Sequence, residues 1–376
     1  MSLPVELKLF MYAGRGSLLG GEDEVIAFTF DETVYGCSVF SIRFKTPNWK
    51  VWDALLKDPD AMIRMRWGFE SEGNSEYVEW KVMRLTDAEL FFYPDRVEIS
   101  ANGFSWGYRM MERAGERSFY GAKLSDIFKE LARQNGLPYD VEETEGAYNL
   151  YESNMTDAEF VKRCLVPNAR STGGRYGYLF YFRSEMRGDV ACFKTPNLSG
   201  QPKTLCVLST QDKVSGNRVI GPVSVSYLPI ETFAGGSLTT RFRAFDPLQK
   251  KFIEQMASDK DTPHIALAKN TFTGPSTPNK IVVSPFQNQR DLRRIAHSSW
   301  CSNSRGLFGV RFSINPDLSL VPDTVVALHM SQARVEDLFV PQTHLLSGKY
   351  YVPSISHVYH NGRYEMEITG ERRDYA

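Results

Sequence analysis

Leu124-Ser-Asp-Ile-Phe-Lys-Glu-Leu-Ala-Arg-Gln-Asn-Gly136 and Asn154-Met-Thr-Asp-Ala-Glu-Phe-Val-Lys-Arg-Cys-Leu165 are two amphipathic stretches separated by a polar link. In the first, apolar residues recur at the spacing of one helical face: Leu124, Ile127, Phe128, Leu131 and Ala132. Gly136 then offers a stop, because glycine takes a left-handed backbone at no steric cost, and Pro138 prevents resumption. The pattern predicts a short helix that ends near Gly136.

The second stretch begins with a capping box, Thr156-Asp-Ala-Glu159, in which the Thr156 hydroxyl can accept from an early backbone N–H and Glu159 can reach back. An apolar stripe follows, made of Phe160, Val161, Cys164 and Leu165. Pro167 ends it. Both predicted helices are too short to be stable alone, so we expect them to pack on a sheet. The aromatic-rich runs 176–182 and 190–193 are the expected strands of that sheet.

This order of motifs resembles the hub proteins of phage tail baseplates. The matching pieces are the helix ending Asn135-Gly-Leu137, the segment Thr156-Asp-Ala-Glu-Phe-Val-Lys-Arg163 and the aromatic hairpin behind them. The late control protein D family of contractile-tailed phages and the N-terminal part of type VI secretion spike proteins belong to this group. The C-terminal segment 348–373 adds a second similar piece, so the resemblance covers nearly the whole chain.

Composition indicates a soluble globular protein. Of the 376 residues, 42% are apolar and 24% charged, and this length predicts two to four modules. The formal net charge of −1 gives no basic footprint, so direct sequence-specific nucleic-acid binding is not expected. Five scattered cysteines without a Cys-x-x-Cys pair indicate reduced thiols and synthesis in the cytoplasm. We expect neither a signal peptide nor a membrane segment, since no basic-then-apolar start and no spanning apolar run occurs.

Strand patterns fill the chain on both sides of the two helices. In the first part, apolar residues alternate with polar ones in runs at 5–11, 25–30, 37–45, 62–69, 77–85, 90–93 and 97–104. Strand patterns return at 223–227, 238–242, 307–314, 324–330 and 349–357. Two helix candidates, 249–257 and 287–302, lie between them. Many short strands separated by turn residues predict an antiparallel barrel or sandwich.

The clearest local signal is the last hairpin. Asn361-Gly362 is a two-residue turn in which both residues can take positive φ. In the strand that follows, Tyr364, Met366 and Ile368 are predicted to point inward, because they alternate with polar residues.

The resemblance implies two domains similar to the tail-tube subunit, the second of them split by an insertion. We therefore predict a mainly β, α+β fold with two tail-tube-like antiparallel β-barrel domains and two smaller α+β inserted domains. The predicted boundaries are 1–117 for the first barrel, 118–205 for the α+β insert, 206–246 with 307–376 for the second barrel, and 247–306 for a small helical and loop insert. No residue-level repeat relates the barrel regions, so their kinship rests on the resemblance.

Glycine-rich segments give only weak signals for ligand chemistry. The run from Gly14 to Gly21 lacks the Gly-x-Gly-x-x-Gly fingerprint and has no following helix, so a hairpin loop is predicted. The run from Ser171 to Gly177 lacks the lysine of a phosphate loop, so a turn is favoured over nucleotide binding.

Histidine and cysteine positions do not form a ligand pattern either. His297 and Cys301 lie one helical turn apart, but no second pair accompanies them, so a packed cysteine beside a polar histidine is favoured over a metal site. His357 and His360 are expected at solvated edge positions of the terminal hairpin. We predict no catalytic, cofactor-binding or metal-binding residues and no enzymatic activity.

Aromatic residues make up 13% of the chain and gather in clusters at Phe91-Phe-Tyr93, at Phe104 with Trp106, and at Tyr178–Phe182. Core packing explains them, and so does subunit contact, because rings supply large buried area at low entropy cost. The sequence leaves both explanations open.

The resemblance implies a structural role in a virion. Three copies, each with two tube-like domains, would form a pseudo-sixfold ring that joins a hexameric tail tube to a trimeric spike. The expected partners are a homotrimer of this chain, the tail tube protein, a separately encoded spike protein and other baseplate proteins, in a tail assembled in the bacterial host. Two other classes remain: a carbohydrate-binding β-sandwich at a tail tip, and a cell-wall hydrolase.

Overall fold

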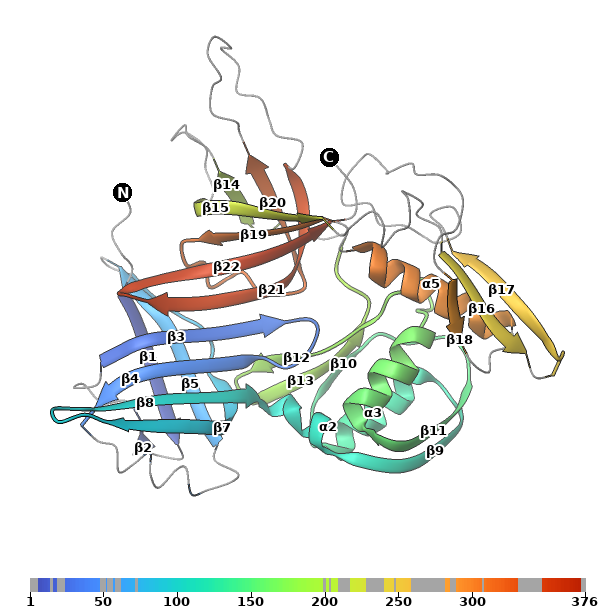
Figure 1. Ribbon diagram of the computed structural model, residues 1–376, viewed down its shortest axis with the longest axis horizontal. Helices are drawn as coiled ribbons and strands as arrows, with labels where there is room; N and C mark the ends of the chain where they lie inside the picture. Colours follow the sequence, from blue (N-terminus) through green and yellow to red (C-terminus); the bar gives the residue numbers. More distant parts are fainter. Residues whose placement is uncertain are drawn as a thin grey trace, which may run out of the picture.

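A computed structural model gives the structure of this chain. It describes residues 6–13, 16–18, 24–47, 52, 57, 62–71, 74–198, 201–202, 204–208, 217–227, 240–246, 248–257, 281–284, 289–305, 308–330 and 347–372. The described part is mainly β with a few helices, so the predicted α+β fold dominated by strands is confirmed (Figure 1). No helix in these ranges combines the length and the apolar character needed to cross a membrane.

The first barrel region is a curved antiparallel sheet. Its strands are β1 (Glu6–Ala13), β2 (Gly16–Ser17), β3 (Glu24–Thr33), β4 (Val39–Thr46), β5 (Met62–Ser71), β6 (Asn74–Tyr77), β7 (Lys81–Phe92) and β8 (Val97–Ser105). They pair in the order β2-β1-β5-β7-β8-β4-β3, with β6 beside β5. The alternation seen in the sequence places one face inward, where the Trp67 ring packs against the Phe30 ring at a tilt, with 4.3 Å between the ring centroids.

The second barrel region closes on itself. Its strands are β14 (Thr204–Leu208), β15 (Asn217–Tyr227), β19 (Phe308–Ile314), β20 (Thr324–Met330), β21 (Gly348–His360) and β22 (Arg363–Arg372). They follow one another as β21-β20-β14-β15-β19-β22, and β22 pairs again with β21. Strand β14 is parallel to both of its neighbours, whereas the other pairs are antiparallel.

The two barrel regions share one continuous sheet. Strand β3 pairs with β4 on one side and with β21 on the other, and the β3–β21 register runs antiparallel from Ala27 opposite His360 to Thr33 opposite Ser354. The connection between the regions is therefore a ladder of main-chain pairs in the middle of a sheet (Figure 1).

The last hairpin confirms the prediction made for it. Asn361 and Gly362 have φ values of 51° and 75°, as a two-residue turn requires. The side chains of Tyr364, Met366 and Ile368 are buried, as expected for inward positions.

The α+β insert contains both predicted helices. Its elements are η1 (Trp106–Tyr108), α2 (Arg109–Glu112), β9 (Ala114–Ala122), α3 (Leu124–Gln134), β10 (Tyr139–Val141), β11 (Tyr148–Thr156), α4 (Asp157–Phe160), η2 (Val161–Leu165), η3 (Val166–Asn168), β12 (Leu179–Glu185) and β13 (Gly188–Lys194). Helix α3 ends before Gly136, whose φ is 69°, and its five predicted apolar residues are buried.

The capping box is also present. The Thr156 hydroxyl accepts from the Glu159 N–H at 3.2 Å, and the Glu159 carboxylate accepts from the Thr156 N–H at 3.1 Å. The helix then changes form, because a π turn (η2) and a 3₁₀ turn (η3) follow α4.

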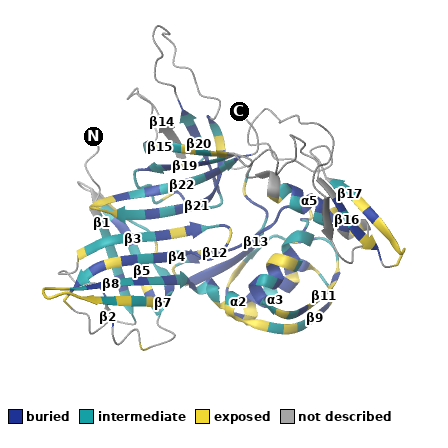
Figure 2. Cartoon of the chain, viewed as in Figure 1, coloured by how far each residue is buried: buried dark blue, intermediate teal, exposed yellow. Residues whose placement is uncertain are grey.

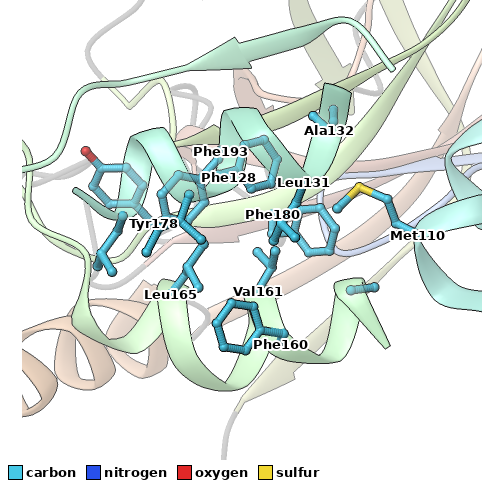
Figure 3. Close-up of a cluster of buried hydrophobic side chains, with 14 of the residues drawn as sticks. Met110, Phe128, Leu131, Ala132, Phe160, Val161, Leu165, Tyr178, Phe180 and Phe193 are labelled. Atoms are coloured by element: carbon cyan, nitrogen blue, oxygen red, sulfur yellow. The ribbon is translucent and has the colours of Figure 1, made fainter. Parts of the chain in front are cut away.

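Aromatic packing stabilises these short helices (Figure 3). The Phe128 ring of α3 stacks on Phe193 of β13 at 5.0 Å and meets Phe180 of β12 edge-on at 5.7 Å. Val161 of η2 is fully buried in the same cluster. The expected packing of two weak helices on an aromatic sheet is therefore confirmed.

A small unit follows the second barrel's first strands. It holds β16 (Thr240–Asp246), β17 (Lys251–Ala257), β18 (Ile281–Ser284) and α5 (Gln289–Arg305). The predicted helix near 287–302 is thus confirmed. Strand β16 pairs with β17 and β18, so it belongs to this unit and not to the large sheet, where the sequence had placed it.

The predicted helix at 249–257 is wrong, since this segment is strand β17. Ile253 is buried between exposed Phe252 and Glu254, which is the period of a strand. A tight turn starts it: the Asp246 carboxylate accepts from the Leu248 N–H at 2.9 Å, and Lys250 has φ of 51°. The turn and the pairing with β16 decide the conformation over local helix propensity.

Two of the aromatic clusters differ in their burial, and subunit contact stays a prediction for the exposed one. Residues Tyr178 to Phe182 are all buried, so core packing accounts for them. Phe91, Phe92 and Tyr93 are exposed by 40%, 63% and 40%, at the tip of the β7–β8 hairpin that projects from the sheet (Figure 2).

Candidate functional site

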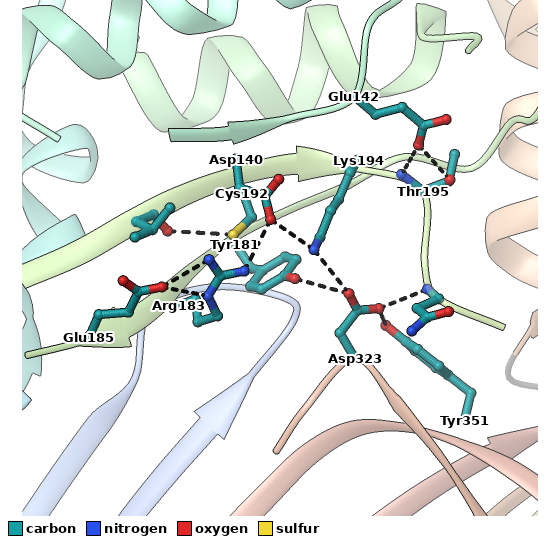
Figure 4. A network of polar contacts seen from close by, with 12 residues as sticks. Asp140, Glu142, Tyr181, Arg183, Glu185, Cys192, Lys194, Thr195, Asp323 and Tyr351 are labelled. Carbon is teal, nitrogen blue, oxygen red and sulfur yellow. Dashed lines mark hydrogen bonds and ion pairs between the residues drawn. The ribbon is translucent and has the colours of Figure 1, made fainter. Parts of the chain in front are cut away.

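The insert meets the second barrel at the Asp323 carboxylate (Figure 4). Its Oδ1 accepts from the Tyr351 hydroxyl at 3.1 Å and from the Asn197 N–H at 2.9 Å. Its Oδ2 accepts from the Tyr181 hydroxyl at 3.2 Å and lies 3.4 Å from Lys194 Nζ. We call these five residues the Asp323 joint. One partly buried acceptor thus holds donors from β12, β13, the following link and β21.

Local backbone geometry aims Asp323 at these donors. The residue lies just before β20 with φ of 64°, a left-handed conformation that aspartate tolerates better than most residues. Its N–H donates to the Val352 carbonyl at 3.0 Å, which fixes it against β21. The side chain therefore leaves the barrel edge and enters the insert.

A chain of charges extends the joint into the insert. Lys194 Nζ lies 3.0 Å from Asp140, and Asp140 also accepts from Arg183 at 3.0 Å. Burial opposes ionisation of Lys194, but its hydrogen bond to Asp140 and the charge of Asp323 raise its pKa. Burial likewise disfavours the Asp140 carboxylate, yet Lys194 and Arg183 hold the pKa of Asp140 below its usual range. Lys194 and Asp140 are therefore both ionised at neutral pH.

The nucleophilic side chains nearby are held in their neutral forms. Burial raises the pKa of the Cys192 thiol to about 11 and that of the Cys37 thiol to about 12. Burial also raises the pKa of the Tyr181 phenol. A poised nucleophile needs a lowered pKa, so this arrangement suits a fixed structural contact and not proton transfer.

A second joint links the first barrel to the insert. Lys81 of β7 lies 2.8 Å from the Glu32 carboxylate of β3 and donates to the Ser184 carbonyl of β12 at 2.8 Å. A cavity of about 360 Å³ adjoins this pair and is also lined by Leu320 and Pro322 of the second barrel. The three units therefore meet around one cavity.

Buried Asp189 reinforces this second joint. Its carboxylate accepts from the Gly107 N–H at 2.6 Å and from the Ser184 hydroxyl at 2.8 Å. Burial raises the pKa of Asp189, whereas the bonds from Ser105, Gly107 and Ser184 oppose that rise.

His357 borders the same cavity, and the expectation of a solvated edge position is wrong for it. Only 2% of His357 is exposed, because β21 is an inner strand covered by β3 and β22. Its Nδ1 lies 2.8 Å from the Tyr364 hydroxyl. Burial lowers the pKa of His357 to about 4, so the imidazole is neutral at physiological pH. His360, by contrast, is exposed as expected.

The other sequence candidates occupy structural positions. The Ser171–Gly177 run is a turn in which the Ser171 hydroxyl accepts from the Arg175 N–H at 2.9 Å. Strand β1 pairs with β2 through Ala13 and Gly16, as a hairpin there requires, although Gly14 and residues 19–21 lie outside the described ranges.

His297 and Cys301 lie on α5, and the structure separates their roles. The His297 ring stacks on Tyr176 at 5.3 Å, and Cys301 packs against the core between α5 and the small sheet. Among the described residues, no group of three or more His, Cys, Asp or Glu side chains is arranged to hold a metal ion.

Sequence reasoning missed the residues of both joints. Asp323 and Tyr181 are 142 positions apart, and Lys81 and Ser184 are 103 apart. No spacing rule connects such residues. The one local signal was Pro322-Asp323 before a strand, and a turn is its ordinary explanation.

Solved structures share this architecture. The tail protein from Neisseria meningitidis MC58 is 11% identical with a TM-score of 0.66, over 98% of this chain and 97% of that one. The 43 kDa tail protein of prophage MuSo2 from Shewanella oneidensis is 11% identical with a TM-score of 0.64, over 98% of this chain and 100% of that one. The E. coli c3393 protein, a component of the type VI secretion system, is 12% identical with a TM-score of 0.53, over 98% and 77%.

At these identities the likeness shows the fold. The chain has the fold of phage tail proteins and of a type VI secretion component, as the helix motifs predicted. A scan of protein-family models and a search of curated proteins found no match.

Proposed function

We propose that this chain is the structural baseplate hub of a phage or phage-like tail, where it initiates the tail tube. Three copies form a ring of six barrels. One face seats the hexameric tail tube, and the other seats a separately encoded trimeric spike. The protein acts through fixed contacts in the virion tail baseplate and carries out no catalysis. Closed rotational symmetry limits its assembly to a ring.

The β3–β21 pairing is the observation that carries this proposal. A symmetry adaptor needs two ring-building bodies held at a constant angle, because three pairs must imitate six equal units. Here the two barrel regions are consecutive parts of one sheet, paired from Ala27–His360 to Thr33–Ser354. A flexible linker would allow the angle to vary, whereas a sheet resists such bending.

Both joints support the same role. The Asp323 joint ties the insert to the second barrel, and Lys81 ties it to the first. The insert therefore braces the two barrel regions from one side. We propose the same three bodies, 1–117, 118–205 and 206–376, with the start of the insert moved to η1 at Trp106 and the small unit beginning at β16.

Light scattering coupled to gel filtration tests the proposal. We expect a species of three times the 42.8 kDa chain mass, and negative-stain images of a three-cornered ring with a central hole. A monomer at all workable concentrations, or a trimer without an axial passage, would contradict the hub assignment. A pull-down with the tail tube protein and the spike protein of the same tail then tests the two faces separately.

A further inference from the structure

A cavity of about 550 Å³ lies between the Ser171–Gly177 turn and the first turns of α5. Most of the side chains that line it are basic or aromatic: Arg170, Tyr176, Arg290, Arg293, Arg294 and His297. We call this site the arginine pocket. Its volume is in the range of small-ligand sites, which is about 300–1,000 Å³.

Aromatic rings hold part of this basic lining in place. The Arg170 guanidinium lies over the Tyr176 ring at 5.5 Å, and the His297 ring stacks on the same tyrosine at 5.3 Å. Arg294 lies over the Tyr148 ring at 5.3 Å and donates to its hydroxyl. Three cationic or polar groups are therefore positioned before any ligand arrives.

A glycine makes the Arg294 position possible. Gly146 has φ of 89°, and a Cβ there would lie 3.0 Å from Arg294 Nη2. The backbone of the insert therefore lets the α5 guanidinium approach closely, which docks the two units against each other.

The described ion pairs involve one of the three exposed or partly exposed arginines of the pocket, Arg170, and neither of the others, Arg290 and Arg293. Within the described part of the chain, the one ion pair of Arg170 is with Glu145, at 3.7 Å. Arg290 and Arg293 are exposed, and neither makes an ion pair with a described side chain.

The positions of the three α5 arginines are also electrostatically unfavourable for the helix. Arg290, Arg293 and Arg294 share the first turns of α5 at i, i+3 and i+4, where like charges repel and the helix dipole favours acidic residues. A local rule broken in this way, at the mouth of a cavity, is typical of a functional position.

We propose that the arginine pocket binds a multivalent oxyanion, through bidentate contacts from Arg290 and Arg293 with Arg170 and Arg294 behind them. Guanidinium groups match the paired oxygens of phosphates and carboxylates. The ligand is either a free polyphosphate-type anion or a set of carboxylates presented by a partner protein. This proposal does not depend on the ring assembly proposed above.

Calorimetric titration of the full chain tests the proposal. Tripolyphosphate, pyrophosphate and citrate are titrated at constant ionic strength, with sodium chloride as the screening control. The test variant is Arg290→Ala with Arg293→Ala. Its matched control is Arg187→Ala with Arg363→Ala, which removes two exposed arginines from hairpin turns elsewhere.

We expect saturable binding of at least one anion, weakened about tenfold or more in the test variant and unchanged in the control. Tighter binding of tripolyphosphate identifies a phosphate ligand, and tighter binding of citrate identifies carboxylates. No binding of any anion overturns the proposal, and so does equal weakening in both variants, which would indicate bulk charge. Circular dichroism checks the fold, and Arg290→Gln with Arg293→Gln replaces the alanine variant if that variant unfolds.

Discussion

The Tyr351 hydroxyl donates a hydrogen bond to the Asp323 carboxylate at 3.1 Å, from the strand that also pairs with the first barrel region. Strand β21 thus carries the β3 ladder along one part of its length and the Asp323 joint along another. Any displacement of β21 would disturb both connections together.

Removal of the Asp323 carboxylate should loosen the joint. Asp323→Ala leaves Lys194 without one of its two acidic partners and removes the carboxylate that accepts from the Tyr181 and Tyr351 hydroxyls, in a site where the Asp323 side chain is 10% exposed. We expect the free energy of unfolding to fall by about 2–4 kcal/mol, measured by denaturant titration. Asp95→Ala, at a 70% exposed surface position, is the control and should change it by less than about 0.5 kcal/mol. Equal effects would show that the joint does not stabilise the fold.

Arg117 should be indispensable to the insert. It lies 2.7 Å from Glu152 and also pairs with Asp157, and both carboxylates are fully buried. Arg117→Ala leaves two adjacent buried acids without a cation, so we expect a loss of about 3–5 kcal/mol.

The matched change on the acid side is Glu152→Gln. Burial, followed by the hydrogen bond to Asp157, raises the pKa of Glu152 to about 7 despite Arg117. A raised carboxyl pKa gives stability at acid pH that is lost as the pH rises from about 4.5 to 7. The free energy of unfolding of Glu152→Gln, relative to that of the natural protein, should therefore be highest above pH 7. If the difference in unfolding free energy between Glu152→Gln and the natural protein does not change with pH, Glu152 does not have the raised pKa.

His357 should give the opposite pH dependence. Its pKa falls from 6.5 to about 4 on folding, so the unfolded chain binds the extra proton between these values. Stability supplied by the neutral imidazole is complete above about pH 6.5 and decreases by up to about 3 kcal/mol as the pH falls towards 4. His357→Asn keeps a partner for Tyr364 and should remove this component, whereas exposed His360→Asn should leave it intact. Parallel curves for the two variants would contradict the assignment.

The tip of the β7–β8 hairpin should contribute to assembly more than to folding. Phe92→Ser removes a ring that is 63% exposed, so the melting temperature of the subunit should change little. If the ring lies in an interface core, the dissociation constant of the assembly should rise about tenfold or more, measured by light scattering on dilution. Tyr120→Ser, at an 80% exposed ring on β9, is the control. Specific binding on a glycan array that Phe92→Ser abolishes would instead favour the carbohydrate-binding alternative.

Local patterns predicted local structure well in this chain. The Thr156–Glu159 capping box and the Asn361-Gly362 turn each depend on neighbours within a few residues, and both are present. The helix predicted at 249–257 is wrong because the composition of this segment suits a helix, whereas its strand form depends on pairing with β16. The solvated position predicted for His357 is wrong because its burial depends on β3, which lies more than 300 residues earlier in the chain. Long-range pairing also explains why neither joint could be predicted.

The β3–β21 ladder has a mechanical consequence. A pull that separates the two barrel regions cannot extend a tether; it has to break consecutive main-chain hydrogen bonds in the interior of a sheet. Load applied to one region therefore passes directly into the other. A molecule built in this way can transmit an axial force from one barrel region to the other with little change in its own shape.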